Sequence, residues 1–167
     1  QTNGVSKAPV DFRLFVQKTA FHLGIKKTVT VWMSENVSVP TVAGFFKPVI
    51  LLPAAIINNL SIQQTEAILL HELAHVRRND YLVNVLQSII QLVLFFNPFA
   101  ILLGKISKSE RENCCDDWVL RFEYNRHEYA NALLILEEKR MFCKTAGLGL
   151  SATNGKKQLL IRIKRLF

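Results

Sequence analysis

The hydrophobic pattern divides the chain into a strand-rich first third and a helical remainder. Residues 28–33 alternate between apolar and polar positions and are rich in β-branched residues, which predicts a strand. Residues 37–42 and 49–52 are predicted as two further strands, with Gly44 and the turn at 47–48 between them. We therefore expect a small N-terminal sheet.

A long helix is predicted to follow this sheet. Ser61 and Gln64 have the spacing of a capping box, in which Ser61 is the N-cap and Gln64 reaches back to its backbone. The apolar run 67–70 then predicts that the helix passes through the core before it reaches His71.

The stretch 81–104 is uncharged throughout and is long enough to suggest a membrane span. Polar residues interrupt it at helical spacing and form one stripe: Asn84, Gln87, Ser88 and Gln91. We predict a helix to about Phe96, then a second helix with Asn97 as N-cap and Pro98 in its first turn. One apolar face of the first helix would remain for lipid or for other helices.

Residues 71–75 read HELAH, the most informative motif of the chain. Positions four apart share a helix face, so His71 and His75 can bind one metal ion. Glu72 is rotated by about 100° from His71, which places its carboxylate beside a water molecule rather than on the metal. The alternative is a solvated or hydrogen-bonded histidine pair; the capped helix and its apolar approach favour a zinc peptidase site.

A third ligand is expected from a second helix, because two-histidine sites of this type take a carboxylate. Glu112 and Asp116 are four residues apart in a segment with a helical pattern. Glu112 would coordinate the metal, and Asp116 would accept the free ring N–H of a ligand histidine. Glu110 is the weaker alternative ligand, and a solvated charged helix surface is the competing interpretation. If His71, His75 and Glu112 bind one ion, they lie on the same side of any membrane. A single full crossing within 81–104 would separate Glu112 from the histidines and is therefore excluded.

Several motifs occur in an order that resembles the BlaR/MecR-type antirepressor metallopeptidases, over about residues 10–140. They are PTVAG at 40–44, KPVI at 47–50, LP at 52–53, HELAHVRRND at 71–80, YLVN at 81–84, NPF at 97–99, RE at 111–112, CD at 115–116 and YANALL at 129–134. The resemblance implies a gluzincin-like domain on the cytoplasmic side of a bacterial inner membrane, within a multi-pass sensor protein. It also implies cleavage of a transcriptional repressor or of the protein itself. By the motifs, His71, His75 and Glu112 would bind zinc, Glu72 would be catalytic and Asp116 would support a ligand.

The expected reaction is hydrolysis of a peptide bond with one zinc ion per chain. Glu72 would take a proton from the attacking water and pass it to the leaving amine. The oxyanion calls for one further donor, and the sequence leaves three candidates open: His127, Tyr124 and Arg111. A zinc-containing scaffold that cleaves nothing is the alternative, but the intact Glu72 argues against it because a structural site needs no base.

The net charge of +8 at pH 7 points to an anionic surface as a neighbour. Basic residues beside membrane segments favour the cytoplasmic side. The segment 153–167 mixes basic and apolar residues and is predicted as an amphipathic helix at a membrane surface. The sequence contains no recognised nucleic-acid-binding motif, so direct binding to DNA or RNA is not expected. A protein or peptide substrate and a membrane contacted through flanking helices are the expected partners, and a homodimer is left open.

Three cysteines, Cys114, Cys115 and Cys143, are too few and too poorly spaced for a disulfide framework. They favour a reducing compartment and a packing role rather than metal coordination. The 167 residues are enough for one domain with a core, and we predict a single α+β domain, mainly helical, over residues 1–167. The start at Gln1, without a signal-peptide pattern, indicates a piece of a larger membrane protein.

Overall fold

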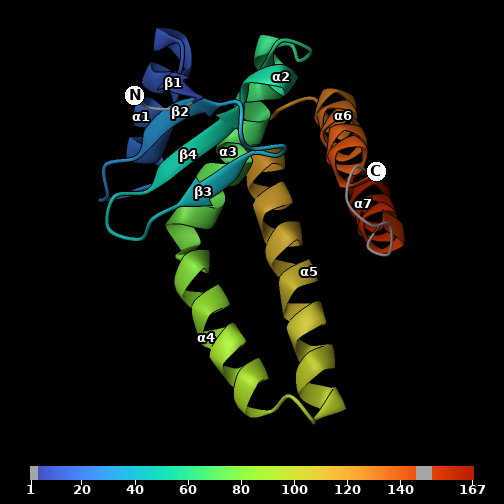
Figure 1. Ribbon diagram of the computed structural model, residues 1–167. Coiled ribbons are helices and arrows are strands. Elements are labelled where there is room, and N and C mark those ends of the chain that lie inside the picture. Colours follow the sequence, from blue (N-terminus) through green and yellow to red (C-terminus); the bar gives the residue numbers. More distant parts are fainter. Residues whose placement is uncertain (1–3, 146–151) are drawn as a thin grey trace.

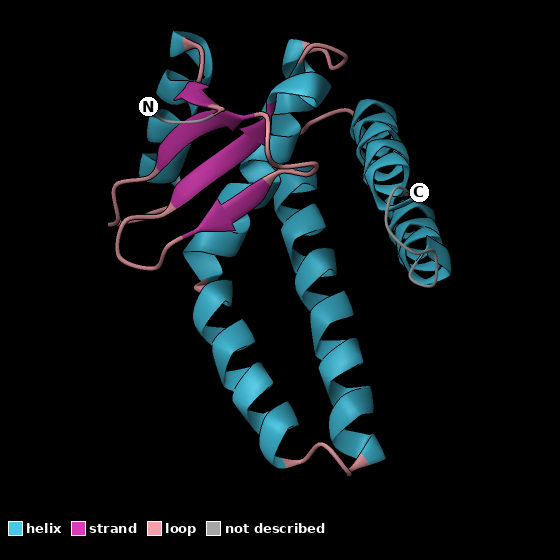
Figure 2. Ribbon diagram, in the orientation of Figure 1, coloured by secondary structure: helices cyan, strands magenta, loops and turns pink. Residues whose placement is uncertain are grey.

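The computed structural model describes residues 4–145 and 152–167 (Figure 1). It is mainly helical with a small N-terminal sheet, which confirms the predicted α+β class (Figure 2). The strands are β1 (Val5–Lys7), β2 (Thr30–Ser34), β3 (Thr41–Ala43) and β4 (Val49–Pro53). The helices are α1 (Val10–His22), α2 (Ala54–Ile57), α3 (Ile62–Arg78), α4 (Asp80–Val93), α5 (Pro98–Arg121), α6 (Arg126–Thr145) and α7 (Ala152–Leu166).

The sheet has the order β1-β2-β4-β3, so β3 and β1 are its edges. Strand β2 runs parallel to β4, whereas the two outer pairs are antiparallel. The strands predicted at 28–33 and 49–52 are confirmed. The strand predicted at 37–42 was wrong for residues 37–40, since only β3 forms; Pro40 lacks the N–H that a ladder needs. Strand β1 was missed because its short polar sequence becomes a strand through pairing with β2.

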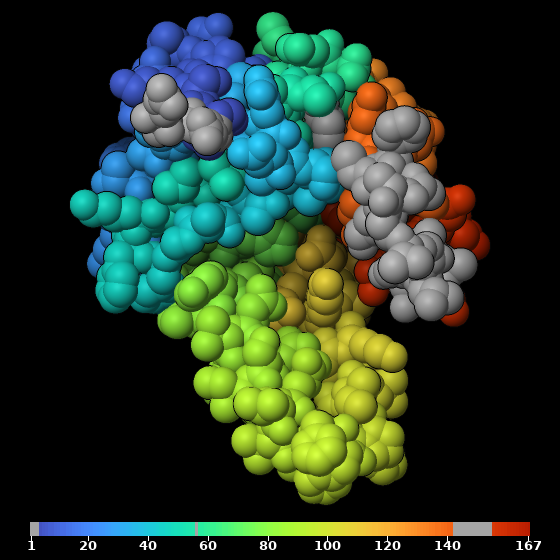
Figure 3. All heavy atoms as spheres, viewed as in Figure 1, coloured from blue at the N-terminus to red at the C-terminus, as the bar shows by residue number. Residues whose placement is uncertain are grey.

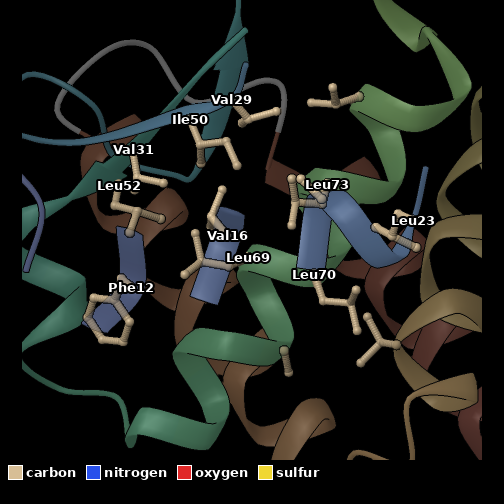
Figure 4. Close-up of a cluster of buried hydrophobic side chains, with 14 of the residues drawn as sticks. Phe12, Val16, Leu23, Val29, Val31, Ile50, Leu52, Leu69, Leu70 and Leu73 are labelled. Carbon is tan, nitrogen blue, oxygen red and sulfur yellow. The ribbon is translucent and has the colours of Figure 1, made fainter. Parts of the chain in front are cut away.

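The hydrophobic core lies between the sheet and the helices α1 and α3 (Figure 4). It includes Phe12 and Val16 from α1, Val31, Ile50 and Leu52 from the sheet, and Leu69, Leu70 and Leu73 from α3. The α3 leucines are completely buried, because the sheet covers one side of the helix while α1, α5 and α6 pack around the others. The helix that carries the HELAH motif is therefore held rigidly in the middle of the domain.

Both ends of α3 are fixed by local interactions. The capping box is confirmed: the Gln64 backbone N–H donates to the Ser61 hydroxyl at 3.1 Å, and the Ser61 N–H donates to the Gln64 side chain at 3.0 Å. At the other end, Asn79 adopts the left-handed conformation with a φ of 55°. This residue redirects the chain into α4 directly after the motif, a break that the hydrophobic pattern did not reveal.

Helices α4 and α5 form a hairpin that projects from the rest of the molecule (Figures 1 and 3). The Asn97 side chain accepts a hydrogen bond from the Phe99 N–H at 2.9 Å and Pro98 begins the next helix, as predicted. Over residues 4–145 and 152–167, the structure contains no helix long and apolar enough to cross a membrane. Helix α5 returns beside α3, which carries Glu112 back to the motif.

The basic C-terminal segment forms a helix as predicted, but it packs on the domain. Helix α7 lies against α6 and α5, with Leu166 buried and Leu159 packed against the core. Part of its apolar side is therefore used inside the domain rather than at a membrane surface. Its Arg162 reaches the residues around the HELAH motif.

Candidate metal centre

Helices α3 and α5 bring the three predicted ligands together. The His71 Nε2 atom lies 3.5 Å from Glu112 Oε2, and His75 Nε2 lies 3.9 Å from Glu112 Oε1. The ligand atoms of the three residues all lie within 4.8 Å of one another. With metal–ligand distances of about 2.0–2.2 Å, the ligand atoms of a tetrahedral zinc site are about 3.3 Å apart. The geometry and the donor types both fit a single zinc ion.

The second nitrogen of each histidine is held by a carboxylate. His75 Nδ1 lies 2.7 Å from Asp80 Oδ2, and His71 Nδ1 lies 3.2 Å from Asp116 Oδ1. Such carboxylates keep the proton on Nδ1, so that the Nε2 lone pair is free for a metal. Asp116 lies where the sequence predicted. Asp80 was missed, although a carboxylate five residues after His75 was a usable signal.

Asp116 is in turn fixed by residues from the two C-terminal helices. The Arg162 guanidinium donates two hydrogen bonds to it, at 2.8 Å from Nε and 2.6 Å from Nη2. The Tyr129 hydroxyl lies 2.7 Å from Asp116 Oδ1 and 2.9 Å from His71 Nδ1. Arg162 also approaches Glu112, with Nη1 at 3.2 Å from Oε2. The sequence did not predict either role, because both residues come from segments distant from the motif.

The electrostatics keep the carboxylates of the cluster ionised. Burial by itself raises the pKa of Glu112. The hydrogen bond and charge of His71 and the charge of Arg162 outweigh this effect and lower the pKa to about 2. The pKa of Asp116 is also lowered: burial opposes this, but the hydrogen bonds from Arg162 and His71 prevail. Burial lowers the pKa of His71, while its hydrogen bonds to Asp116 and Glu112 raise it to a net value of about 9. Metal binding at neutral pH must therefore displace a proton from this imidazole.

A cleft of about 430 Å³ opens over the cluster. Glu72 lines it beside His71 and His75, and its side chain is partly exposed. One wall is formed by the edge strand β3 with the residues that precede it, and the opposite wall by α6 and α7. The cleft is therefore open to an extended peptide, which could reach both the His71, His75 and Glu112 cluster and the Glu72 carboxylate.

The three candidates for oxyanion stabilisation lie elsewhere. The Tyr124 hydroxyl donates to Glu66 at 3.1 Å, and Arg111 Nη1 donates to the Gln87 side chain at 3.0 Å. The ring of His127 packs against an aromatic ring at the C-terminus of the chain. Of the described residues that line the cleft, none is one of these three. The structure thus does not bring them to the site.

Of the remaining acidic and thiol candidates, Glu110 stays outside the cluster, whereas Cys115 Sγ lies 3.4 Å from His75 Nδ1 and forms a second group of potential metal ligands with His75 and Asp80. Glu110 is exposed and accepts a hydrogen bond from Asn113 at 3.4 Å. Cys114 and Cys115 are free thiols, and Cys115 is completely buried. Burial raises the pKa of the Cys115 thiol, which disfavours the thiolate form that a metal ligand needs and agrees with the predicted packing role. The side chain of Cys143 lies outside the described residues.

Two imidazoles and a carboxylate that converge under an open cleft, on a helical domain with a small sheet, define a metallopeptidase-type domain. The chain belongs to the BlaR1 peptidase M56 family, whose model matches residues 6–166. This membership confirms the resemblance inferred from the motifs.

Three relatives illustrate the similarity. The methicillin resistance mecR1 protein of Staphylococcus aureus is 34% identical over 104 residues, which is 62% of this chain and 18% of that protein. The regulatory protein BlaR1 of Bacillus licheniformis is 33% identical over 110 residues, covering 66% of this chain and 18% of the relative. BlaR1 of Staphylococcus aureus is 26% identical over 145 residues, 85% of this chain and 24% of the relative. The chain thus spans about a fifth of the length of these proteins.

Replacement of Asp116 by asparagine tests the carboxylate behind His71. The variant keeps the size of the side chain but removes the charge that holds the Nδ1 proton, so zinc affinity should fall about 10–100-fold. Competition with a chromophoric chelator measures this. The matched control is Asp117→Asn, since Asp117 is partly exposed and pairs with Arg165. Equal affinities in the two variants would mean that Asp116 serves only to anchor α7.

Proposed function

We propose that this chain is the zinc-dependent endopeptidase domain of a membrane-bound signal transducer, and that it hydrolyses a peptide bond in the transducer itself or in a cytoplasmic repressor. One observation carries the proposal. His71, His75 and Glu112 converge on the same cleft that the Glu72 carboxylate lines. Membership of a peptidase family supports the same reaction type.

Zinc is the metal that suits this donor set. Two imidazoles and one carboxylate with an open side are the ligands of hydrolytic zinc sites. A bound zinc ion supplies Lewis acidity, which lowers the pKa of a water molecule and polarises a carbonyl group. Asp80 and Asp116 hold the ligand histidines in the tautomer that this binding requires, and we propose one ion per chain.

Glu72 is the proposed general base. It follows His71 directly on α3, so its carboxylate reaches the cleft without competing for the place of a ligand. It accepts a proton from the attacking water and delivers that proton to the amine that leaves. A scaffold without peptidase activity would have no use for an ionisable carboxylate in an open cleft beside two imidazoles, so we favour the enzyme.

The edge strand β3 is the proposed docking site for the substrate. It pairs with β4 on one side, while Thr41 and Val42 line the cleft. In the described part of the chain no strand covers its other edge. A peptide in extended conformation can add there as a further strand, with backbone hydrogen bonds that are independent of sequence. Leu133 and Leu136 of α6 give the facing wall an apolar surface for side chains.

The signalling context is proposed from the relatives. Their printed names describe a methicillin resistance protein and regulatory proteins, and this chain spans about a fifth of their length. We propose that further parts of the protein hold the membrane spans and the sensor. Lysine and arginine residues beside membrane segments favour the cytoplasmic side, so we propose that this basic domain lies on that side of a bacterial inner membrane, where a repressor is within reach.

Peptide cleavage with and without metal tests this function. The zinc-loaded chain and the full-length protein in lipid nanodiscs are each incubated with a proteome-derived peptide library, and new termini are identified by mass spectrometry. We expect cleavage that a zinc chelator abolishes and that added zinc restores. Cleavage that persists in the chelator would exclude a metal mechanism. Absence of cleavage by the zinc-loaded full-length protein, with the library and with the cell's own repressors, would favour the scaffold.

A further inference from the structure

The α4–α5 hairpin carries a large group of exposed apolar residues. They are Tyr81, Leu82, Val83, Val85, Leu86, Ile89, Ile90, Leu92, Val93, Phe95, Phe96, Phe99, Ile101, Leu102, Leu103 and Ile106. The hairpin projects from the body of the domain, so these apolar residues lie on a protrusion (Figure 3). Surfaces of this kind mark binding to a membrane or to a protein.

Two glutamines of the hairpin, Gln87 and Gln91, are half-buried and face Gly104, whereas Asn84 and Ser88 are exposed. The Gln87 side chain lies between the helices, where it donates to the Gly104 carbonyl at 2.9 Å and accepts from Arg111 at 3.0 Å. A Cβ atom at Gly104 would collide with the amide of Gln91 and lie 2.8 Å from that of Gln87, so glycine leaves room for the ends of these two side chains. A helix in water turns its polar side outward. An amide that is hydrogen-bonded between two helices, a small residue opposite it and an apolar exterior are instead typical of helices in lipid.

The width of the apolar surface favours lipid over a protein partner. At 100° per residue, the apolar positions of α4 cover roughly 200° of its circumference, and the polar stripe covers the rest. A partner helix or a second copy of the chain would bury one face of α4 and leave much of this arc in water. The tip adds three phenylalanines, Phe95, Phe96 and Phe99, with exposed fractions of 72%, 71% and 73%. Hydrocarbon can cover the whole arc and the tip together.

The positions of the charged residues along α5 agree with insertion of the hairpin to the depth of one leaflet. Residues 81–104 are uncharged, and the first charged residues of α5 are the exposed Lys105 and Lys108. At 1.5 Å per residue they lie about 10 and 15 Å from the start of α5 at Pro98. The hydrocarbon of one leaflet is about 15 Å thick, half of a total of about 30 Å. Both lysines can therefore reach anionic head groups while the tip is in the acyl chains.

We propose that the tip of the α4–α5 hairpin inserts into one leaflet of an anionic bilayer, with Lys105 and Lys108 at the level of the head groups. Both ends of the hairpin join the body of the domain, so the chain enters the leaflet and returns on the same side. This anchor is independent of zinc and of peptide cleavage. It goes beyond the proposed enzyme, because it places the domain's own fold in the membrane rather than only its flanking segments.

Flotation with vesicles tests the anchor. The purified chain should float with vesicles that contain phosphatidylglycerol, and the double substitution Phe95→Asp with Phe96→Asp should lower the bound fraction at least tenfold. The matched control is Ile62→Asp, because Ile62 is also exposed but lies at the opposite end of α3 from the hairpin. Both variants change exposed positions, so their thermal unfolding midpoints should equal that of the parent chain.

Tryptophan at the tip gives a second measurement that leaves the charge unchanged. The emission of Phe96→Trp should shift to shorter wavelength on vesicles and be quenched by lipids brominated on the acyl chains, whereas Ile62→Trp should show neither effect. Vesicle binding that survives the double substitution, without quenching at the tip, would mean adsorption by basic charge and would overturn the proposal. So would a dimer in solution that the double substitution dissociates, if the parent chain does not float.

Discussion

Replacing Glu72 with glutamine is expected to lower the rate of peptide-bond hydrolysis by about 10²–10⁴-fold while one zinc ion per chain remains bound. The amide keeps the size of the side chain but cannot accept a proton from water. The three proposed ligands are unchanged, and Glu72 is not one of them. The measurement combines the rate of cleavage of a peptide identified from the library with the zinc content of the purified variant.

The control for this variant is Glu66→Gln on the same helix. Glu66 accepts a hydrogen bond from Tyr124 and lies outside the set of described residues that line the cleft. Its substitution should leave both the rate and the zinc content near those of the parent chain. If Glu72→Gln cleaves at the parental rate, the role of Glu72 as base is wrong. If it loses zinc, Glu72 is a ligand rather than a base.

Replacing His75 with alanine is expected to weaken zinc binding by more than about a hundredfold. Loss of a ligand should exceed the effect of losing a carboxylate behind one, which is about 10–100-fold. Both ring nitrogens of His75 take part in the proposed site, since Nε2 faces Glu112 and Nδ1 contacts Asp80. Metal analysis after gel filtration should change from about one zinc ion per chain to far less than one.

The fold should survive this substitution, which makes the result interpretable. Asp80 is buried, but Arg78 remains near its carboxylate, with Nε at 3.5 Å from Oδ1. His22→Ala is the control, because His22 is exposed on α1 and belongs to no described group of metal-type ligands. A His75→Ala chain that still binds one zinc ion tightly would refute the proposed ligand set.

The two variants together separate the proposed enzyme from its alternatives. An accidental histidine pair on a membrane-binding module predicts no specific zinc in the parent chain, so His75→Ala would change nothing. A zinc-containing scaffold predicts loss of metal in His75→Ala but no cleavage for Glu72→Gln to abolish. The proposed peptidase predicts both effects, and the hairpin anchor predicts neither, because Phe95 and Phe96 lie far along the chain from the ligands.

The sequence by itself determined those features that depend on near neighbours along the chain. The start of α3 follows from a hydrogen-bond exchange between Ser61 and Gln64, and the start of α5 from Asn97 and Pro98. The pairing of His71 with His75 follows from helix periodicity alone. Glu112 and Asp116 were found because the motif demands a carboxylate and a second helix supplies two at the right spacing.

Only the tertiary structure decided which distant side chains meet at this pair. Arg162 comes from a helix whose composition predicted a membrane surface, yet it binds Asp116, 46 residues earlier in the chain. Tyr129 reaches His71 in the same way, whereas Tyr124, five residues before it, points to Glu66. Periodicity cannot make this choice, because each contact depends on how whole helices pack against one another. The sequence thus specified the helices that carry the proposed ligands, and packing selected the residues that hold those side chains in place.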